Sequence, residues 1–151
     1  MHLYARYLEQ PQLNVNGESH EKTALKGVLE PKGHYSPAFE VDGLVFSSGL
    51  LPVDLGTGEP LPAGFESQLE TLFGNVEALL CAAGCRKEDV IKVTAYISDV
   101  ALWGRFDAAY SNFFGSHKPA RSVVPLAGKL HYGLDVEMEF IAKRGGEANE
   151  C

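Results

Sequence analysis

The segment AFEVDGLVFS, residues 38–47, contains the most specific local signal in the chain. Two runs of β-prone residues flank Asp42-Gly43, and an Asp-Gly pair tolerates the positive φ angles that a two-residue hairpin turn requires. The pattern therefore predicts a β-hairpin with strands at 38–41 and 44–47. Residues 1–33, which precede this region, are harder to interpret and form an extension that we expect to be partly irregular.

Two amphipathic helices are predicted after the hairpin. Apolar side chains recur at helical period over residues 65–83 and form one broad stripe, and Gly84 suits the C-terminal end of such a helix. A second stripe covers about residues 100–114, where Asp99 suits the N-cap position. Each helix can bury only one face, so we expect a sheet to cover both.

Three further segments are predicted as strands. Residues 122–126 are β-like, but Pro125 restricts them to a sheet edge or a bulge. Residues 136–142 alternate, with Val136, Met138, Phe140 and Ala142 on one face. Residues 90–98 also alternate, and we expect Ile91, Val93, Ala95 and Ile97 on one face and Val90, Lys92, Thr94 and Tyr96 on the other. The whole order predicts an α/β (α+β) sandwich with both helices on one face of a sheet.

Composition and charge exclude several classes of function. The 151 residues are 45% hydrophobic and 22% charged, which is typical of one globular domain. A net charge of −7 gives no general attraction to nucleic acid or to anionic membranes. No apolar run is long enough for a membrane span, and neither the cysteines nor the histidines have metal-ligand spacing. We therefore expect a cytoplasmic protein without a metal, a nucleic-acid partner or a membrane partner.

Two charged residues stand out as candidates for chemistry. Arg121 follows a proline at the start of a strand, and its planar guanidinium suits a carboxylate, although a surface salt bridge is the alternative. Glu137 lies in a strand that must be largely buried. Its carboxylate is either solvated on the open sheet face or held for acid–base work, and with Glu139 it could also belong to a subunit interface. The sequence alone does not show that Arg121 and Glu137 meet.

The chain resembles the RidA (YjgF) family of reactive-intermediate deaminases from about residue 34 to 142. PARS at 119–122 and VEMEFIA at 136–142 are the most specific matching segments. The others, in chain order, are YSPA at 35–38, FSSG at 46–49, PVD at 52–54, TG at 57–58, Gln68, Asn75-Val76, Ala83-Gly84, DVIKVT at 89–94 and FF at 113–114.

The resemblance implies a chorismate-mutase-like fold and a homotrimer with its sites at subunit interfaces. It also implies hydrolysis of imines or enamines to a carbonyl compound and ammonia, without a metal or organic cofactor. In this interpretation residues 34–143 form the single domain and residues 144–151 a flexible tail.

Site residues follow by position from the resemblance. Arg121 corresponds to the arginine that binds the substrate carboxylate, and Glu137 to the glutamate that positions or activates water. Tyr35, Ser48 and Gly49 match further substrate-binding positions. Val123 stands where many members have a cysteine whose backbone is the useful part, so it also counts as substrate-binding.

Three departures from the family pattern concern the substrate. Leu50 replaces the usual glutamine, and Asp107 replaces the asparagine of members that hydrolyse 2-iminobutanoate. Asp107, which we count as substrate-binding, could pair with Arg121 or meet a cationic group. Residues 128–135 replace a shorter connection, and His131 or Tyr132 could line an altered pocket. These changes leave open a non-catalytic, trimeric small-molecule-binding or regulatory protein, whereas the acidic charge counts against an RNA-cleaving one.

Overall fold

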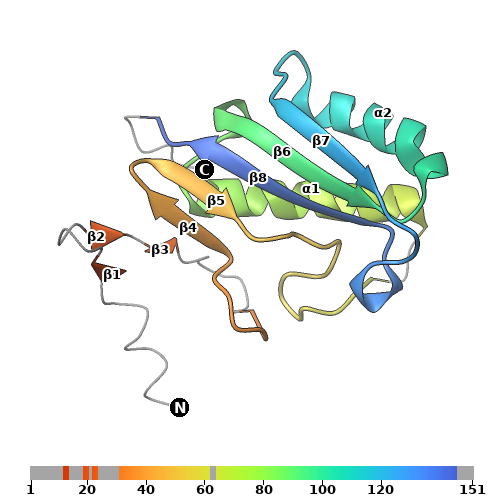
Figure 1. Cartoon of the computed structure of the whole chain (residues 1–151), viewed down its shortest axis with the longest axis horizontal. Coiled ribbons are helices and arrows are strands. Elements are labelled where there is room, and N and C mark those ends of the chain that lie inside the picture. Colours follow the sequence, from red (N-terminus) through yellow and green to blue (C-terminus); the bar gives the residue numbers. More distant parts are fainter. Residues whose placement is uncertain (1–11, 14–18, 21, 24–30, 62–63, 146–151) are drawn as a thin grey trace.

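A computed structural model describes residues 12–13, 19–20, 22–23, 31–61 and 64–145 of the chain (Figure 1). The main sheet has the strand order β3-β4-β5-β8-β6-β7. These strands are β3 (Lys22–Thr23), β4 (Ala38–Val41), β5 (Leu44–Ser47), β6 (Val90–Ile97), β7 (Ala120–Pro125) and β8 (Val136–Lys143). The helices are α1 (Phe65–Ala82) and α2 (Trp103–Phe114), with 3₁₀ turns η2 (Lys87–Asp89), η3 (Val100–Leu102) and η4 (His131–Gly133). A separate pair joins β1 (Gln12–Leu13) to β2 (Ser19–His20).

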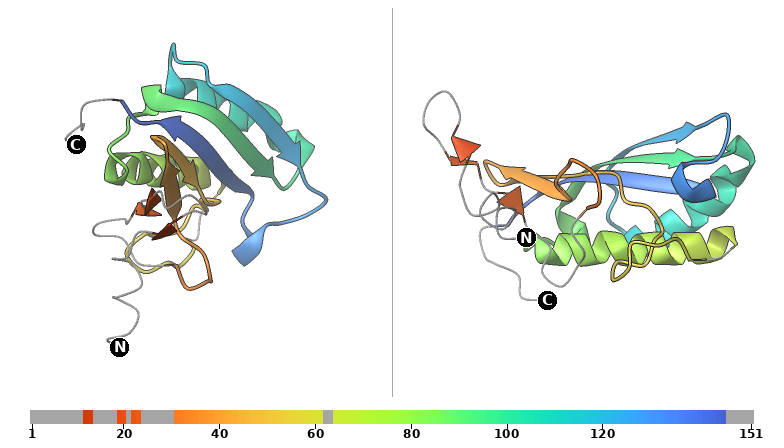
Figure 2. Two further views of the ribbon diagram at one scale, coloured as in Figure 1. Left: turned by 60° about the vertical axis from the view of Figure 1, so that its left-hand side comes forward. Right: turned by 90° about the horizontal axis from the view of Figure 1, so that it is seen from below.

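Both helices cover the same face of the sheet, which leaves the other face open (Figure 2). The sheet is mixed, because β6 and β7 run parallel while the neighbouring pairs along the rest of the sheet are antiparallel. The predicted sandwich and its order of elements are confirmed. Pro125 is the last residue of the edge strand β7. No further strand of the described residues pairs with the outer side of β7, so a residue without an N–H breaks no hydrogen bond between strands there.

Local sequence signals account for the ends of the elements. Asp42 and Gly43 form the hairpin turn with φ of 51° and 73°. Helix α1 buries its apolar stripe against the sheet and is followed by Gly84 with φ of 69°. Asp99 caps the turn before α2, since its Oδ1 accepts a hydrogen bond from the Ala101 N–H at 2.8 Å. The predicted hairpin and both helices are therefore confirmed.

The predicted faces of β6 are wrong at its start. Val90 is fully buried and Ile91 is 48% exposed, because the pairing of β6 with β8 shifts register between Val90 and Lys92. A bulge at this point inserts one extra residue, so the alternation of side chains between the two sheet faces is broken between Val90 and Lys92 and resumes after it. Val93, Ala95 and Ile97 then point into the core as expected.

Both ends of the chain lie largely outside the described residues. Of the predicted extension, β3 joins the main sheet, with Lys22 opposite Phe39 and Thr23 opposite Ala38. At the other end, Arg144 donates two hydrogen bonds to the carbonyl of Ala83 and forms an ion pair with Glu40 at 2.8 Å. Residues 146–151 of the predicted tail are not among those described. No helix in the described part of the chain is long and apolar enough to cross a membrane.

Candidate functional site

Glu137 lies on the open face of the sheet, as the second residue of strand β8. Its neighbours Val136 and Met138 are fully buried on the helix side, so alternation turns the Glu137 carboxylate to the opposite face. Burial raises the pKa of this carboxyl above its ordinary value, the charge of Glu139 raises it further, and His131 opposes the rise. Glu137 therefore favours the protonated form more than a solvated glutamate does.

Gly49 lies directly against the Glu137 carboxylate. A Cβ atom at position 49 would lie 1.9 Å from Glu137 Oε1 and 2.9 Å from its Cδ. The next residue, Leu50, pairs with Met138, since each backbone N–H donates to the other's carbonyl at 2.8 and 3.0 Å. This bridge fixes the distance between the backbone at residue 50 and strand β8. Only a glycine at position 49 therefore leaves room for the Glu137 carboxylate. Leu50 itself packs against the core, so its side chain lies away from Glu137.

Ser48 holds the segment before the hairpin close to this glycine. Its hydroxyl donates to the Ser36 carbonyl at 2.6 Å, and its backbone N–H donates to the Pro37 carbonyl at 2.9 Å. Tyr35 precedes these two residues and is 58% exposed. We name Glu137, Gly49 and Ser48 the Glu137 half-site. The structure brings these three predicted residues together and leaves Tyr35 at their margin.

The unusual segment at 128–135 is fastened to the fold by Asp135. Its carboxylate accepts hydrogen bonds from Ser98, Lys129 and Gln68, and its N–H donates to Gln68 Oε1 at 2.8 Å. Burial disfavours the ionised carboxylate, but these hydrogen bonds outweigh burial and lower the pKa of Asp135. The sequence analysis missed the role of this residue, although an aspartate directly before a strand with buried side chains was a usable signal.

Arg121, the other predicted catalytic residue, lies on edge strand β7. Its Nη1 donates to Asp107 Oδ1 at 2.7 Å, and its Cζ lies 4.6 Å from the centre of the Tyr110 ring. Asp107 and Tyr110 both belong to helix α2, and Val123 follows Arg121 on the same face of β7. We name Arg121, Asp107, Tyr110 and Val123 the Arg121 half-site. The predicted pairing of Asp107 with Arg121 is present.

The two half-sites face opposite sides of one chain's sheet. Arg121 is in register with Val93, which is fully buried under the helices, and Arg121 contacts helix α2. Glu137 is in register with Tyr96 on the open face. One chain therefore does not bring Arg121 and Glu137 together, and a site that uses both needs a second copy of the chain.

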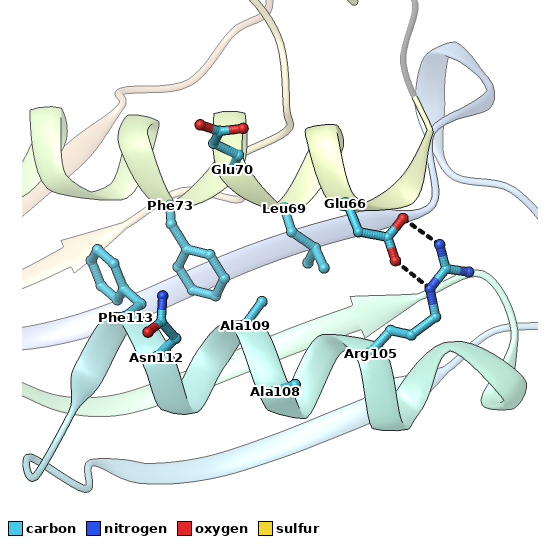
Figure 3. Close-up of a pocket in the computed structure, with 9 residues that line it drawn as sticks. All are labelled: Glu66, Leu69, Glu70, Phe73, Arg105, Ala108, Ala109, Asn112 and Phe113. Carbon is cyan, nitrogen blue, oxygen red and sulfur yellow. Dashed lines mark hydrogen bonds and ion pairs between the residues drawn. The ribbon is translucent and has the colours of Figure 1, made fainter.

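A groove of about 570 Å³ lies elsewhere, between α1 and α2 (Figure 3). Leu69, Phe73 and Phe113 form its apolar part, and the ion pair of Glu66 with Arg105 lies at one end. None of the predicted site residues lines this groove. It is a feature of the outer helix layer and is separate from both half-sites.

Metal ligands are not clustered in the described part of the chain. No group of three or more His, Cys, Asp or Glu side chains there could hold a metal ion together. The chemistry available at the two half-sites is that of two carboxylates, a guanidinium, two hydroxyls and backbone groups.

Comparison with known proteins gives matches of the chain within one family. The family model described as Endoribonuclease L-PSP matches residues 26–144. A RutC family protein of Aquifex aeolicus is 39% identical over 114 residues, covering 74% of this chain and 90% of that protein. TdcF of Escherichia coli, whose name assigns it provisionally to the reactive intermediate deaminases, is 36% identical over 115 residues, covering 74% and 88%. The crystal structure of TdcF with bound serine covers 83% of this chain and 99% of TdcF, with a TM-score of 0.74 and 32% identity.

Proposed function

The chain belongs to the RidA/YjgF/L-PSP (RutC) family, and on this premise we propose that it hydrolyses small carboxylate-bearing imines or enamines to a carbonyl compound and ammonia. The observation that carries this proposal is the Glu137 carboxylate, half-buried against Gly49 with a raised pKa. A carboxyl group whose pKa is raised is better suited than a solvated one to exchange protons with water and with a nitrogen leaving group.

Glu137 supplies the proton transfers that C=N hydrolysis requires. It accepts a proton from water while the water oxygen bonds to the carbon of the C=N group. It then returns that proton to the nitrogen and takes up the remaining hydroxyl proton as the C=O bond forms, the C–N bond breaks and ammonia leaves. Gly49 contributes space, because any side chain there would displace the Glu137 carboxylate from its position. No metal or organic cofactor takes part in this scheme.

Arg121 supplies the anchor for the substrate carboxylate. Its side chain is 25% exposed, and the guanidinium lies over the Tyr110 ring. A guanidinium binds a carboxylate through two parallel hydrogen bonds, which fixes the orientation of a small substrate as well as its affinity. TdcF binds serine, a small molecule that carries a carboxylate, and this relative supports the size class.

A homotrimer with shared sites reconciles the opposite directions of the two half-sites. Arg121 of one copy would face Glu137 of the next across each interface, so that a closed ring completes three equivalent sites. The open sheet face, which carries Thr94, Tyr96 and Ile141, would be covered in the same assembly. Light scattering tests this part, and a monomer at micromolar concentration contradicts it.

Ribonuclease activity, which the description of the family model names, is disfavoured by charge. The chain has a net charge of −7, and Glu137 and Glu139 both face the open side of the sheet. Phosphate backbones are bound chiefly through Lys and Arg, so this face is unsuited to RNA.

Ammonia release from freshly generated 2-imino acids tests the proposed reaction. The parent chain should accelerate release, and a matched chain with Glu137→Gln should release ammonia at close to the uncatalysed rate. A non-catalytic binding protein would show no acceleration in either chain while still binding a 2-oxo acid in a calorimetric titration.

A further inference from the structure

The guanidinium of Arg121 already has an anionic partner within its own chain. Asp107 Oδ1 accepts from Arg121 Nη1 at 2.7 Å, and the two side chains are 48% and 25% exposed. The remaining N–H groups of the guanidinium fork have no partner among the described residues. The Arg121 half-site thus carries one positive and one negative charge, both within reach of a ligand.

The hydroxyl of Tyr110 is a second sign that this half-site is incomplete. Tyr110 is 7% exposed, and its hydroxyl is buried without a hydrogen-bond partner in the part of the chain that the structure describes. Burial raises the pKa of Tyr110 to about 12, with Arg121 and Asp107 as its charged neighbours, so the hydroxyl stays a neutral donor. An unpaired buried hydroxyl is unfavourable, so the residue that supports Arg121 carries a polar group that the described part of the chain leaves unsatisfied.

We propose that Asp107 makes the Arg121 half-site selective for zwitterionic substrates, binding the protonated C=N nitrogen while Arg121 binds the carboxylate. This inference rests on the proposed function and adds the charge state of the substrate to it. A purely anionic ligand would gain Arg121 but would be repelled by Asp107. A zwitterion places an opposite charge beside each member of the pair, and each contact is a charge-assisted hydrogen bond.

This arrangement favours binding of the substrate over binding of the product. The balanced step is C=NH₂⁺ + H₂O → C=O + NH₄⁺, in which the water oxygen bonds to carbon and the C–N bond breaks. Asp107 stabilises the protonated imine, which is the form that water attacks most readily. The carbonyl product has no N–H for Asp107 and is a simple anion, so the half-site binds it more weakly and releases it.

The test compares two stable ligands with one carbon skeleton. In calorimetric titrations 2-aminobutanoate stands in for the protonated imino acid, and 2-oxobutanoate stands in for the product. We expect the parent to bind 2-aminobutanoate about 10-fold or more tightly than 2-oxobutanoate, as one charge-assisted hydrogen bond implies. Asp107→Asn, which keeps the shape of the side chain, should abolish or reverse this preference.

Glu66→Gln is the matched control. It also removes the carboxylate of an ion pair with an arginine, since Glu66 Oε1 accepts a hydrogen bond from Arg105 Nε at 2.6 Å (Figure 3). Arg105 lies two positions before Asp107 in α2, and residues two apart point to nearly opposite sides of a helix. The net charge changes by the same amount, but the ratio of the two affinities should stay that of the parent.

Two outcomes overturn the inference while leaving deamination intact. One is a parent that binds 2-oxobutanoate as tightly as 2-aminobutanoate, or more tightly. The other is an Asp107→Asn chain that keeps the parent's preference, whether its two affinities are unchanged or both change by one common factor. A parent that deaminates imino acids but binds neither ligand at millimolar concentration also overturns it. Failure of the proposed function gives a different result, because the parent then does not accelerate ammonia release from imino acids, whatever its affinities for the two ligands.

Discussion

The Arg121 half-site and the Glu137 half-site hold a partly buried charge in opposite ways. Arg121 is neutralised inside its own chain by Asp107 at 2.7 Å and rests on the Tyr110 ring. Glu137 has no cationic partner at hydrogen-bond distance among the described residues, and Glu139 on the same face adds a like charge. One half-site therefore holds its charge at little cost, whereas the other holds a carboxylate that burial and repulsion disfavour.

This difference separates a binding role from a proton-transfer role. A guanidinium keeps its charge at any physiological pH, and its value lies in geometry, which Asp107 and Tyr110 fix. A glutamate is useful for proton transfer only if its pKa moves toward the working pH, which a salt bridge would prevent. That Glu137 forms no ion pair within the described part of the chain is thus consistent with acid–base work.

The largest effect is expected from Glu137→Gln. The amide is nearly isosteric but transfers no proton, so kcat should fall by about 10²–10⁴-fold while ligand affinity is largely kept. Steady-state ammonia release and calorimetric titration with a 2-oxo acid measure the two quantities.

Glu139→Gln serves as the control for that variant. It removes a like charge from the same face, which lowers the pKa of Glu137, so the acidic limb of the pH–rate profile should move to lower pH without a comparable loss of kcat. If Glu137→Gln retains the full parental rate, the acid–base role is wrong.

Arg121→Ala should show the next largest effect, and on binding as well as rate. Two charge-assisted hydrogen bonds are lost, and a loss of about 3 kcal/mol corresponds to roughly 10²-fold in kcat/KM. Arg121→Lys should restore only part, because an ammonium does not reproduce the planar fork. A variant with unchanged KM and kcat would remove Arg121 from the site.

Mixing the two inactive chains tests whether the half-sites meet across an interface. If Arg121 comes from one copy and Glu137 from the next, co-refolded Arg121→Ala and Glu137→Gln chains regain some intact sites. With random assembly into a ring, about one quarter of the sites carry both native residues, and the mixture should approach a quarter of parental activity. A site built within one chain would stay inactive at every mixing ratio.

The sequence was sufficient for those parts of the fold that depend on neighbouring residues. The turn at Asp42-Gly43, the stripe of α1 and the alternation of β8 are all local, and each is confirmed. The start of β6 was mispredicted, because its bulge arises from the pairing with β8 and leaves no mark in the order of Val90 and Ile91.

The candidate site was predictable by residue but not by arrangement. Arg121 and Glu137 were identified from residue type and from family resemblance. Their opposite directions follow from strand register, which places Arg121 opposite Val93 and Glu137 opposite Tyr96. The contact of Gly49 with Glu137 joins residues far apart in the chain, so only the folded sheet reveals why position 49 is a glycine.

Gly49→Ala should have a smaller effect that is confined to the Glu137 half-site. A Cβ atom 1.9 Å from Glu137 Oε1 forces the carboxylate aside, and a displacement of this size should lower kcat about 10-fold or more. The φ of Gly49 is not in the left-handed region, so the backbone accepts alanine. Gly74→Ala in α1 is the control, since nothing lies within 4 Å of a Cβ there and activity should not change. Equal losses in both variants would exclude a local cause.

The smallest expected effect is a change in stability, and it distinguishes the two buried carboxylates by sign. The pKa of Glu137 is raised in the folded chain, so the native state binds this proton more tightly than the unfolded state does. The stability that Glu137 provides is therefore complete below its unfolded value of about 4.5 and is lost as pH rises through the folded pKa. Glu137→Gln should then be more stable than the parent at neutral pH, and this advantage should vanish in acid.

Asp135→Asn should behave in the opposite way. Burial disfavours the charge of Asp135, but hydrogen bonds from Lys129, Ser98 and Gln68 lower its pKa below the ordinary 3.8. Its contribution is present above that value and is lost as pH falls through the folded pKa, so the variant should be less stable than the parent at neutral pH. Urea unfolding of the parent and both variants across a pH series measures the two differences. If Glu137→Gln is destabilised at neutral pH as Asp135→Asn is, then Glu137 is a structural carboxylate, and the contrast between the two half-sites loses its basis.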